Sequence, residues 1–387
     1  MKRILVLSFY YPPDLCAGSF RCDALVSELI ECGAFVHVIT TMPNRYKSFE
    51  PVPDNRSSAF LVIDRAPVAS HKSGMLDQVR SFFDYYRKAM SIAEKKDYDL
   101  VVATSSRLFT AFLGARISRK KGLPLYLDIR DLFSDTITNI LNPVFSSFIR
   151  IIIGCVEKYT FKTASKINLV SLGFKAYFKK NYKEIPLSFF TNGIDDEFMN
   201  LRQGVKKKGN AGHHVNILYA GNIGEGQGLH KIIPGMADSL GEKVRFKIIG
   251  DGGRVEALQQ EIADRQLNNV EVLPPVNRTT LIDEYQRADV LFLHLNDYEA
   301  FRKVLPSKLF EYGAMDKPIL AGLSGYSRDF VEEELTFCTV FPPADIDGAI
   351  EAFNSIEYDV IPRVAFVKKF SRKGVMKEMA RQIIDVN

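Results

Sequence analysis

Short apolar runs alternate with amphipathic stretches along most of the 387-residue chain. The runs are rich in valine, isoleucine, leucine and phenylalanine, and they are nearly continuous rather than alternating with polar residues. Strands of this kind are typical of parallel sheets covered by helices on both faces. The pattern therefore predicts an α/β protein with doubly wound, Rossmann-like sheets. The predicted strands are 3–9, 35–41, 60–65, 99–105, 124–130, 166–171, 187–193, 215–221, 244–252, 269–275, 289–295, 318–322 and 337–343, with helices expected at 75–96, 253–265 and 345–353.

The strand–helix rhythm runs twice, with one polar, glycine-containing break that carries three consecutive lysines, 206–208. A chain of this length is too long for a single core, so two domains are expected. We expect a first domain over 1–195, a linker over 196–213 and a second domain over 214–360. The remaining segment, 361–387, has a helical pattern and can cross back to the first domain. Two such domains would face each other across a cleft, and ligands of open α/β sheets bind beyond the carboxyl ends of the strands.

Composition excludes several classes of protein. The chain is 46% hydrophobic and 25% charged, as globular proteins are, and no apolar run approaches the roughly 18–20 residues that span a bilayer. The N-terminus fits a first buried strand better than a signal peptide. Five cysteines without metal-type spacing argue against a disulfide framework and favour the cytoplasm. His213–His214 fits a solvated loop, and Asp345–Asp347 fits a helix cap rather than a metal motif.

The net charge of +5 is unevenly distributed. Between Arg150 and Glu184 there are eight lysines or arginines and only two acids. Residues 145–184 combine this charge with apolar and aromatic side chains, as segments that lie on anionic membranes do. The segment predicts a peripheral contact with the inner face of the cytoplasmic membrane; the alternative is an interior helix with ordinary lysines. Nucleic acid is not a favoured partner, because no recognised binding module accompanies the charge.

Two strand ends in the first half carry candidate site residues. Gly18 precedes a helical pattern directly after the first strand, where a glycine lets a backbone approach a ligand and a helix N-terminus favours negative charge. After the fifth strand, Asp128 and Arg130 share one face and Asp131 follows. Charged residues at such a place either pair structurally or reach into a site, and we favour the site.

The second half has glycine-rich turns after two strands. A strand ends at Gly221 and glycines follow at 224, 226 and 228 before a helix, and Gly250 belongs to a second strand-to-glycine turn, IIGDGG, 248–253. Backbone amides in such turns can cradle phosphate. The dinucleotide fingerprint is not satisfied, because the third glycine has the wrong spacing.

The stretch RKVLPSKLFEYGAMDKPILAG, 302–322, places Pro306 where a helix begins. Ser307, Lys308 and Glu311 then share a neighbourhood on that helix, because residues three and four apart are neighbours. The free amides of the first turn and the lysine suit a diphosphate, and a carboxylate one turn deeper suits a ribose diol. The alternative is a solvated Lys–Glu pair, which would seldom lie between two apolar strands.

Taken together, these blocks resemble the GT-B glycosyltransferases of family 4, the retaining nucleotide-sugar enzymes of cell-surface polysaccharide synthesis. The similarity is greatest to the subgroup that includes the N-acetylfucosamine transferases of O-antigen and capsule assembly. The resemblance spans nearly the whole chain and rests on the order of its blocks. The blocks are FYYPPDLCAGSFR, DIRDLFSD, FFTNGIDDEFM, YAGNIGEGQGL, IIGDGG, LPPVNRTTLIDEYQRADVLFLHL and VLPSKLFEYGAMDKPILAG.

The resemblance implies roles for individual positions. The turn at Gly18 would approach the donor phosphates and the acceptor, Pro275 and Val276 would flank the base, and Glu311 would hold the ribose. It also exposes departures. Asn222 and Gln227 stand where the family often has an arginine and a lysine, and Lys303 stands where its paired-glutamate motif has the other glutamate. The positive charge for the diphosphate would then come from Lys308 and Arg130.

The implied reaction moves a sugar, such as an N-acetylated deoxyhexosamine, from a UDP-sugar to a lipid-linked or glycan acceptor with retention of configuration. No metal or other cofactor is expected, and Arg130, Asp131 and Lys308 are the candidate catalytic residues. Two alternatives stay open: a UDP-sugar 2-epimerase of the same architecture, and a non-catalytic partner subunit of a transferase.

Overall fold

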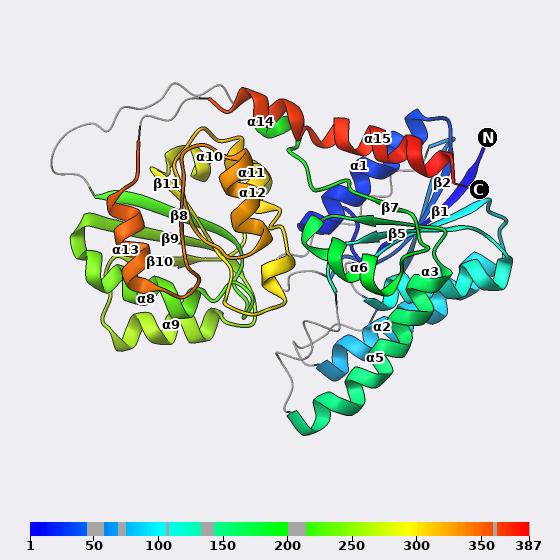
Figure 1. Cartoon of the computed structure of the whole chain (residues 1–387), viewed down its shortest axis with the longest axis horizontal. Helices are drawn as coiled ribbons and strands as arrows, with labels where there is room; N and C mark the ends of the chain where they lie inside the picture. The colour runs from blue at the N-terminus through cyan, green and yellow to red at the C-terminus, as the bar shows by residue number, and fades with distance from the viewer. Residues whose placement is uncertain are drawn as a thin grey trace. The chain divides into compact units, whose positions relative to one another are not determined.

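The structure is a computed structural model of the chain, and it divides into two compact units (Figure 1). Unit 1 comprises Met1–Asn192 and Arg372–Asn387, and unit 2 comprises Gly193–Ser371. The structure describes residues 1–44, 58–68, 75–105, 108–132, 143–199, 214–358 and 362–386, without the side chains of 75–79, 108 and 143–150. The predicted linker residues 200–213 and the end of the DIRDLFSD block, 133–135, lie outside the described residues.

Unit 1 is built on a seven-stranded parallel sheet in the order β3-β2-β1-β4-β5-β6-β7. Parallel pairing aligns Val6 of the central strand with Val38 on one side and Val102 on the other. All the carboxyl ends therefore lie at one edge of the sheet. The strands are β1 (Arg3–Leu7), β2 (Phe35–Thr41), β3 (Leu61–Ala66), β4 (Leu100–Thr104), β5 (Leu125–Ile129), β6 (Lys166–Leu169) and β7 (Leu187–Ser188).

Helices cover both faces of this sheet. On one face α1 and the C-terminal α15 pack together over β1, β2 and β4, and the red α15 lies beside the blue α1 in Figure 1. On the other face, Gly114 of α3 lies so close to the sheet that a Cβ there would be 2.6 Å from Ala103 Cβ. The helices of unit 1 are α1 (Ala17–Glu31), α2 (Met75–Glu94), α3 (Leu108–Lys121), α5 (Pro143–Thr163), the 3-10 turn η1 (Leu172–Phe174), α6 (Lys175–Asn181) and α15 (Arg372–Ile384).

Unit 2 is built on a six-stranded parallel sheet in the order β10-β9-β8-β11-β12-β13. Alternate residues of each apolar run enter two different cores: Ile217 and Tyr219 of β8 face α8, α9 and α13, and Leu218 and Ala220 face α10, α11, α12 and α14. Burial on both faces explains why the runs are continuous. The strands are β8 (Val215–Asn222), β9 (Val244–Asp251), β10 (Val270–Leu273), β11 (Val290–His294), β12 (Ile319–Gly322) and β13 (Cys338–Phe341). The helices are α7 (Asp196–Met199), α8 (Leu229–Leu240), η2 (Gly241–Lys243), α9 (Val255–Asp264), α10 (Arg278–Arg287), η3 (Phe301–Lys303), α11 (Lys308–Gly313), α12 (Tyr326–Glu334), α13 (Ile346–Asn354) and α14 (Val364–Lys369).

Every predicted strand is present, and the predicted α/β class with two Rossmann-like sheets is confirmed. Asp345 caps α13 as expected, with its carboxylate accepting the Gly348 N–H at 3.0 Å. The terminal segment differs from the single crossing helix that the pattern suggests. It forms α14, which stays in unit 2 because Phe366 and Phe370 pack on Phe310, and then α15, which belongs to unit 1. The unit boundaries accordingly fall at 192/193 and 371/372.

In the part of the chain that the structure describes, no helix has both the length and the apolar character needed to cross a membrane.

Candidate functional site

A cation, a phenol and a carboxylate meet at the start of α11 in unit 2. Lys308 Nζ lies 2.9 Å from Glu311 Oε2 and 2.9 Å from the Tyr285 hydroxyl, and that hydroxyl donates to the same Glu311 oxygen at 2.9 Å. Lys308 and Glu311 are one turn apart on α11, whereas Tyr285 comes from α10. The side chains of Lys308 and Glu311 are 22% and 9% exposed, so this is not the solvated pair of the alternative interpretation.

Electrostatics keep this cluster charged. Burial favours the neutral form of Glu311, but the charges of Lys308 and Arg278 and the hydrogen bonds from Lys308 and Tyr285 outweigh it. The pKa of the Glu311 carboxyl therefore lies below its usual range. Burial, reinforced by the neighbouring Glu311 charge, raises the pKa of Tyr285 well above its usual value, so the phenol stays a donor. At neutral pH the cluster therefore presents an ionised Glu311 carboxylate and a neutral Tyr285 phenol beside Lys308.

Lys308 lies over the carboxyl end of β8. A Cβ built on Gly221 would be 3.5 Å from Lys308 Cε, so the lysine stem runs past this glycine. Gly250, at the end of β9, approaches the same place: a Cβ there would be 1.8 Å from the Gly221 carbonyl oxygen. Only glycine fits at Gly250, and the two strand ends can approach each other closely beneath the lysine.

The glycine-rich turn after β8 is closed by its own side chains. Asn222 Nδ2 donates to Gln227 Oε1 at 2.7 Å, and the Gly224 N–H reaches the same oxygen at 3.3 Å. The Gln227 carbonyl accepts from His294 Nδ1 at 2.6 Å, while His294 Nε2 accepts the Ala344 N–H at 2.9 Å. His294 thus joins this turn to the loop after β13 as a neutral imidazole with its proton on Nδ1, and burial lowers its pKa to about 4.

Glu225, at the tip of the same turn, is held by several hydrogen bonds and ion pairs. Glu225 accepts the Tyr298 hydroxyl at 2.6 Å and pairs with Lys231 at 3.2 Å and with Arg254. Although partial burial raises it, these partners lower the pKa of Glu225 to about 2. Asn296 donates to the Glu225 carbonyl at 3.0 Å, so the turn is held against the loop that follows β11.

The remaining predicted residues of unit 2 lie in the loop after β10 and directly before α11. Pro275 and Val276 are half-buried between β10 and α10. Ser307 precedes α11 without a capping hydrogen bond from its side chain. The expected row of free amides is wrong for two positions: the N–H groups of Leu309 and Phe310 donate to the Pro306 and Ser307 carbonyls, both at 3.2 Å. Tight i to i+3 bonds begin this six-residue helix, so the positive character of the site comes chiefly from Lys308.

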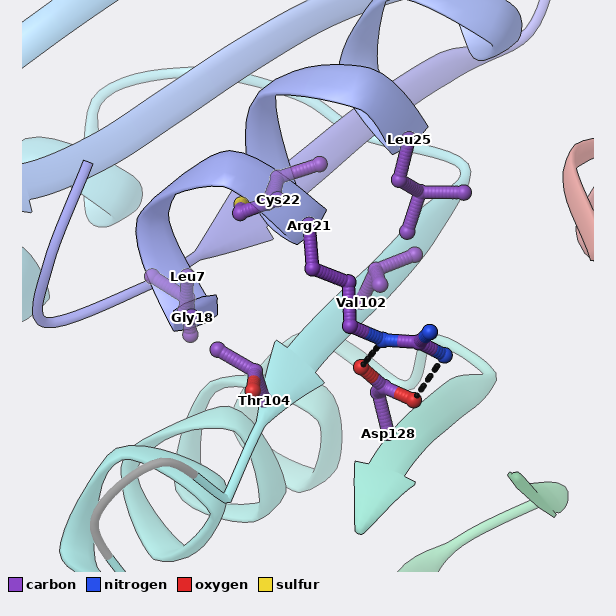
Figure 2. A pocket seen from close by; sticks show the side chains of 9 residues that line it. Leu7, Gly18, Arg21, Cys22, Leu25, Val102, Thr104 and Asp128 are labelled. Atoms are coloured by element: carbon purple, nitrogen blue, oxygen red, sulfur yellow. Dashed lines mark hydrogen bonds and ion pairs between the residues drawn. The ribbon is translucent and has the colours of Figure 1, made fainter. Parts of the chain in front are cut away.

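In unit 1, Asp128 is a structural partner rather than an open site residue. Arg21 of α1 donates from Nε and Nη2 to its two oxygens at 2.8 and 2.9 Å (Figure 2). Asn168 Nδ2 adds a third bond at 2.8 Å, and Asp128 is 4% exposed. The expectation that Asp128 reaches into a site is therefore wrong, because a buried carboxylate needs these donors.

Gly18 and Arg130 lie at the carboxyl edge of the unit 1 sheet, where sequence reasoning placed them. Gly18 lines a small cavity with Leu7, Thr104 and the Arg21–Asp128 pair (Figure 2). Arg130 is half-buried, with its N–H bonded to Ser105 Oγ at 2.8 Å and its guanidinium 3.5 Å from the Ala17 carbonyl. Asp131 follows as an exposed residue. Arg130 and Asp131 belong to unit 1 and Lys308 to unit 2, so the structure of each unit alone does not bring the three together.

Sequence reasoning missed Tyr285, Arg278 and Arg21. Arg21 and Tyr285 are polar residues on helix faces that are otherwise apolar, and this was the available signal, whereas Arg278 is the first residue of α10 and carries no such signal. Arg21 lies between Gly18 and the buried Leu25 on α1 and is itself 2% exposed, and Tyr285 is fully buried. No group of three or more potential metal-ligating residues is found among the described residues.

Residues 203–372 match the family model described as glycosyl transferases group 1. This segment covers nearly all of unit 2. This matched region is the group 1 segment. The group 1 segment contains Asn222, Gln227, Gly250, Lys308 and Glu311, whereas the candidates Gly18, Arg130 and Asp131 lie outside it.

One curated relative is WcaI of Escherichia coli K12, named as a colanic acid biosynthesis glycosyl transferase. It is 36% identical over 93 residues, which are 24% of this chain and only 23% of the relative. The chain thus matches about a quarter of that relative's length. The N-acetylfucosamine-type subgroup is not among these findings.

Solved structures match along the whole chain. Sucrose-phosphate synthase of Thermosynechococcus elongatus is 14% identical, with a TM-score of 0.78 and 100% of both chains covered. WaaG, a glycosyltransferase involved in lipopolysaccharide biosynthesis, is 15% identical, with a TM-score of 0.65 over 98% of this chain and 95% of its own. HepE of Anabaena, solved in complex with UDP, is 16% identical, with a TM-score of 0.58 over 100% and 96%. At these identities the likeness establishes the GT-B fold alone.

Proposed function

We propose that the protein is a retaining glycosyltransferase of cell-surface polysaccharide synthesis. In this proposal it moves a sugar, such as an N-acetylated deoxyhexosamine, from a UDP-sugar to a lipid-linked or glycan acceptor. The observation that carries the proposal is the Lys308–Tyr285–Glu311 cluster at the carboxyl edge of the unit 2 sheet, within the group 1 segment. Relatives named for colanic acid and lipopolysaccharide synthesis, and a neighbour holding UDP, support the substrate class.

The cluster offers complementary groups for two parts of a nucleotide. The Lys308 ammonium would bind diphosphate oxygens, and the Glu311 carboxylate would accept hydrogen bonds from the ribose diol. Charge-assisted hydrogen bonds of this kind are roughly twice as strong as neutral ones. Glycines at 221 and 250 leave the strand ends without side chains, so a ligand backbone can come close to the lysine.

In the proposed reaction the bond from the anomeric carbon to the diphosphate oxygen breaks, and a bond to the acceptor oxygen forms on the same face of the sugar. The acceptor proton passes to the leaving diphosphate oxygen. Positive groups that stabilise this oxygen as charge develops lower the barrier. Lys308 supplies that charge, with Arg130 and Asp131 proposed as further catalytic residues and no metal required.

The proposed acceptor is reached at a membrane surface. On α5, Ile151 and Ile152 are 66% and 48% exposed, and Lys158 and Lys162 are exposed further along the same helix. The opposite side of α5 is buried, with Phe161 1% exposed. One face of the helix therefore packs in unit 1, and the other combines apolar and cationic side chains suited to anionic lipid.

Calorimetric titration with UDP tests the nucleotide site. We expect micromolar binding by the wild-type protein, a loss of at least tenfold in Glu311→Ala, and a similar loss in Lys308→Ala. As matched controls, Glu332→Ala and Arg328→Ala remove an exposed ion pair on α12 and should leave UDP affinity unchanged. Equal affinity in Glu311→Ala and the wild type would refute the assigned site.

Product analysis separates the rival functions. Incubation with UDP-sugars and a lipid-linked acceptor should give a new glycoside and UDP. An epimerised UDP-sugar formed without acceptor would identify a 2-epimerase. Absence of any nucleotide binding would instead identify a non-catalytic subunit, a role compatible with Asn222, Gln227 and Lys303 at their positions.

A further inference from the structure

Arg278 of unit 2 pairs with two carboxylates and interacts electrostatically with a third. Its guanidinium pairs with Asp195 through Nη2 and with Glu197 through Nε. It is also close enough to Glu311 for each charge to act on the other. The side chains of Arg278 and Asp195 are 19% and 20% exposed, so this pair is only partly screened by solvent, whereas Glu197 is 57% exposed and its pair is screened more strongly.

Aromatic rings connect Arg278 to the proposed nucleotide site. The guanidinium carbon lies 4.8 Å from the centre of the Phe198 ring, and the Phe198 ring lies 6.0 Å from that of Tyr285. The Tyr285 hydroxyl in turn donates to Glu311. Arg278 therefore rests on a packed surface that ends at the carboxylate proposed to hold the ribose.

The carboxylates that hold Arg278 come from the segment that enters unit 2. Asp195 and Glu197 follow directly after the boundary at 192/193. The neighbouring Ile194 N–H donates to the Phe370 carbonyl at 2.7 Å, and Ile194 forms a parallel bridge with Ser371 at the other boundary. The position of Arg278 thus depends on the chain segment that enters unit 2 after the 192/193 boundary, which is called the joining segment.

We propose that Arg278 is a positioning residue that switches between Asp195–Glu197 and Glu311, and thereby controls access of a sugar nucleotide to Glu311. While Asp195 and Glu197 pair with Arg278, its guanidinium is held away from Glu311, and the Glu311 carboxylate is open to the ribose. When the joining segment moves so that Asp195 and Glu197 no longer contact Arg278, the guanidinium pairs with Glu311 and displaces the ribose. This inference rests on the proposed function.

The competition follows from the bonds that Glu311 already makes. Among the described residues, both hydrogen bonds to the Glu311 carboxylate end on Oε2. Glu311 Oε1 can accept a hydrogen bond from a ribose diol. A released Arg278 guanidinium would donate to the same oxygen and so compete with the diol. Arginine forms paired bonds with carboxylates, so an unrestrained Arg278 would be a strong competitor for a neutral diol.

Removing the charges of Asp195 and Glu197, which hold Arg278, tests the proposal. The isosteric variant Asp195→Asn/Glu197→Gln should bind UDP and uridine at least tenfold more weakly than the wild type in calorimetric titration, because Arg278 can then pair with Glu311. Adding Arg278→Gln to this background should restore both affinities to within about threefold of wild type. A purely structural role for Arg278 would give no such rescue, since the third substitution would add to the damage.

The control variant Asp329→Asn/Glu333→Gln makes the same charge change at exposed positions of α12 and should bind like the wild type. Circular dichroism melts of every variant check that it is folded. Unchanged affinity in the double variant, or failure of the triple variant to recover in folded protein, overturns the switch. Failure of the wild type to bind UDP, or insensitivity to Glu311→Ala, would instead overturn the proposed function itself.

Discussion

The Arg21 guanidinium forms two parallel hydrogen bonds with the buried Asp128 carboxylate, at 2.8 and 2.9 Å. The same guanidinium donates to the carbonyls of Thr191 and of Phe190, the latter at 2.8 Å. One side chain therefore ties α1, β5 and the chain just before the boundary at Asn192 into a single network.

Arg21→Met should destabilise unit 1 by about 3–5 kcal/mol, because it leaves Asp128 buried without its cation. Urea denaturation followed by fluorescence or circular dichroism measures this. The matched control Arg3→Met breaks an exposed pair, with side chains 49% and 44% exposed, and should cost no more than about 1 kcal/mol. Similar losses in both variants would show that burial does not determine how much the Arg21–Asp128 pair contributes to the free energy of unfolding.

His294 should make unit 2 less stable in acid. Its folded pKa of about 4 lies below the ordinary value of 6.5, so the unfolded chain binds more protons between these pH values. Stability is fully present above pH 6.5 and falls as the pH drops towards 4, by roughly 3 kcal/mol for this residue. Urea midpoints between pH 7 and 4.5 should show a weaker pH dependence in His294→Gln, whose amide can replace both hydrogen bonds. An unchanged pH dependence would contradict the assignment.

Gln227→Glu should weaken UDP binding about tenfold at low salt while sparing uridine. The carboxylate keeps the acceptor for Asn222 and Gly224 but adds negative charge to the turn beside Lys308, a repulsion of roughly 1–2 kcal/mol against the diphosphate. Calorimetric titration at 20 and 200 mM salt measures both ligands. Gln260→Glu, on the exposed side of α9, is the charge-matched control. Equal losses for UDP and uridine would mean that the turn does not contact phosphate.

The wild-type protein should sediment with vesicles that contain anionic lipid at low salt. Ile151→Asp/Ile152→Asp should abolish most of this binding, since it places charge on the apolar part of the exposed α5 face. Val364→Asp, at a 70% exposed position of unit 2, is the control and should bind like the wild type. Sedimentation that is equal for neutral and anionic vesicles, or absent throughout, would remove α5 as a membrane contact.

The strands were predictable because both sheets are covered on both faces, which leaves few polar positions inside each run. The Lys308–Glu311 neighbourhood was equally predictable, since spacing of three on a helix follows from helical geometry. The partners of these residues were not. Tyr285 reaches Glu311 from another helix 26 positions earlier, and Arg21 lies 107 positions from Asp128. Such distances depend on how the sheet is ordered, which local pattern does not reveal.

The error at Asp128 has the same origin. Its sequence position, at the carboxyl end of a strand, is compatible with both a site residue and a structural pair. Asn168, a polar residue inside the apolar β6 run, was the visible sign that a buried polar partner had to exist nearby. The amides before α11 were misjudged because a pattern cannot distinguish a short helix that begins with tight i to i+3 bonds from a longer one.

The packing of α15 on α1 has a consequence for how the nascent chain folds during synthesis. Met376, Met379, Ala380 and Ile383 lie in the same core as the first strand, all fully buried. Unit 2 is encoded between the two parts of unit 1, and it can therefore finish folding while the N-terminal part still lacks a side of its core. The nascent N-terminal region should be open to proteases or dependent on chaperones until α15 emerges, although it is synthesised first.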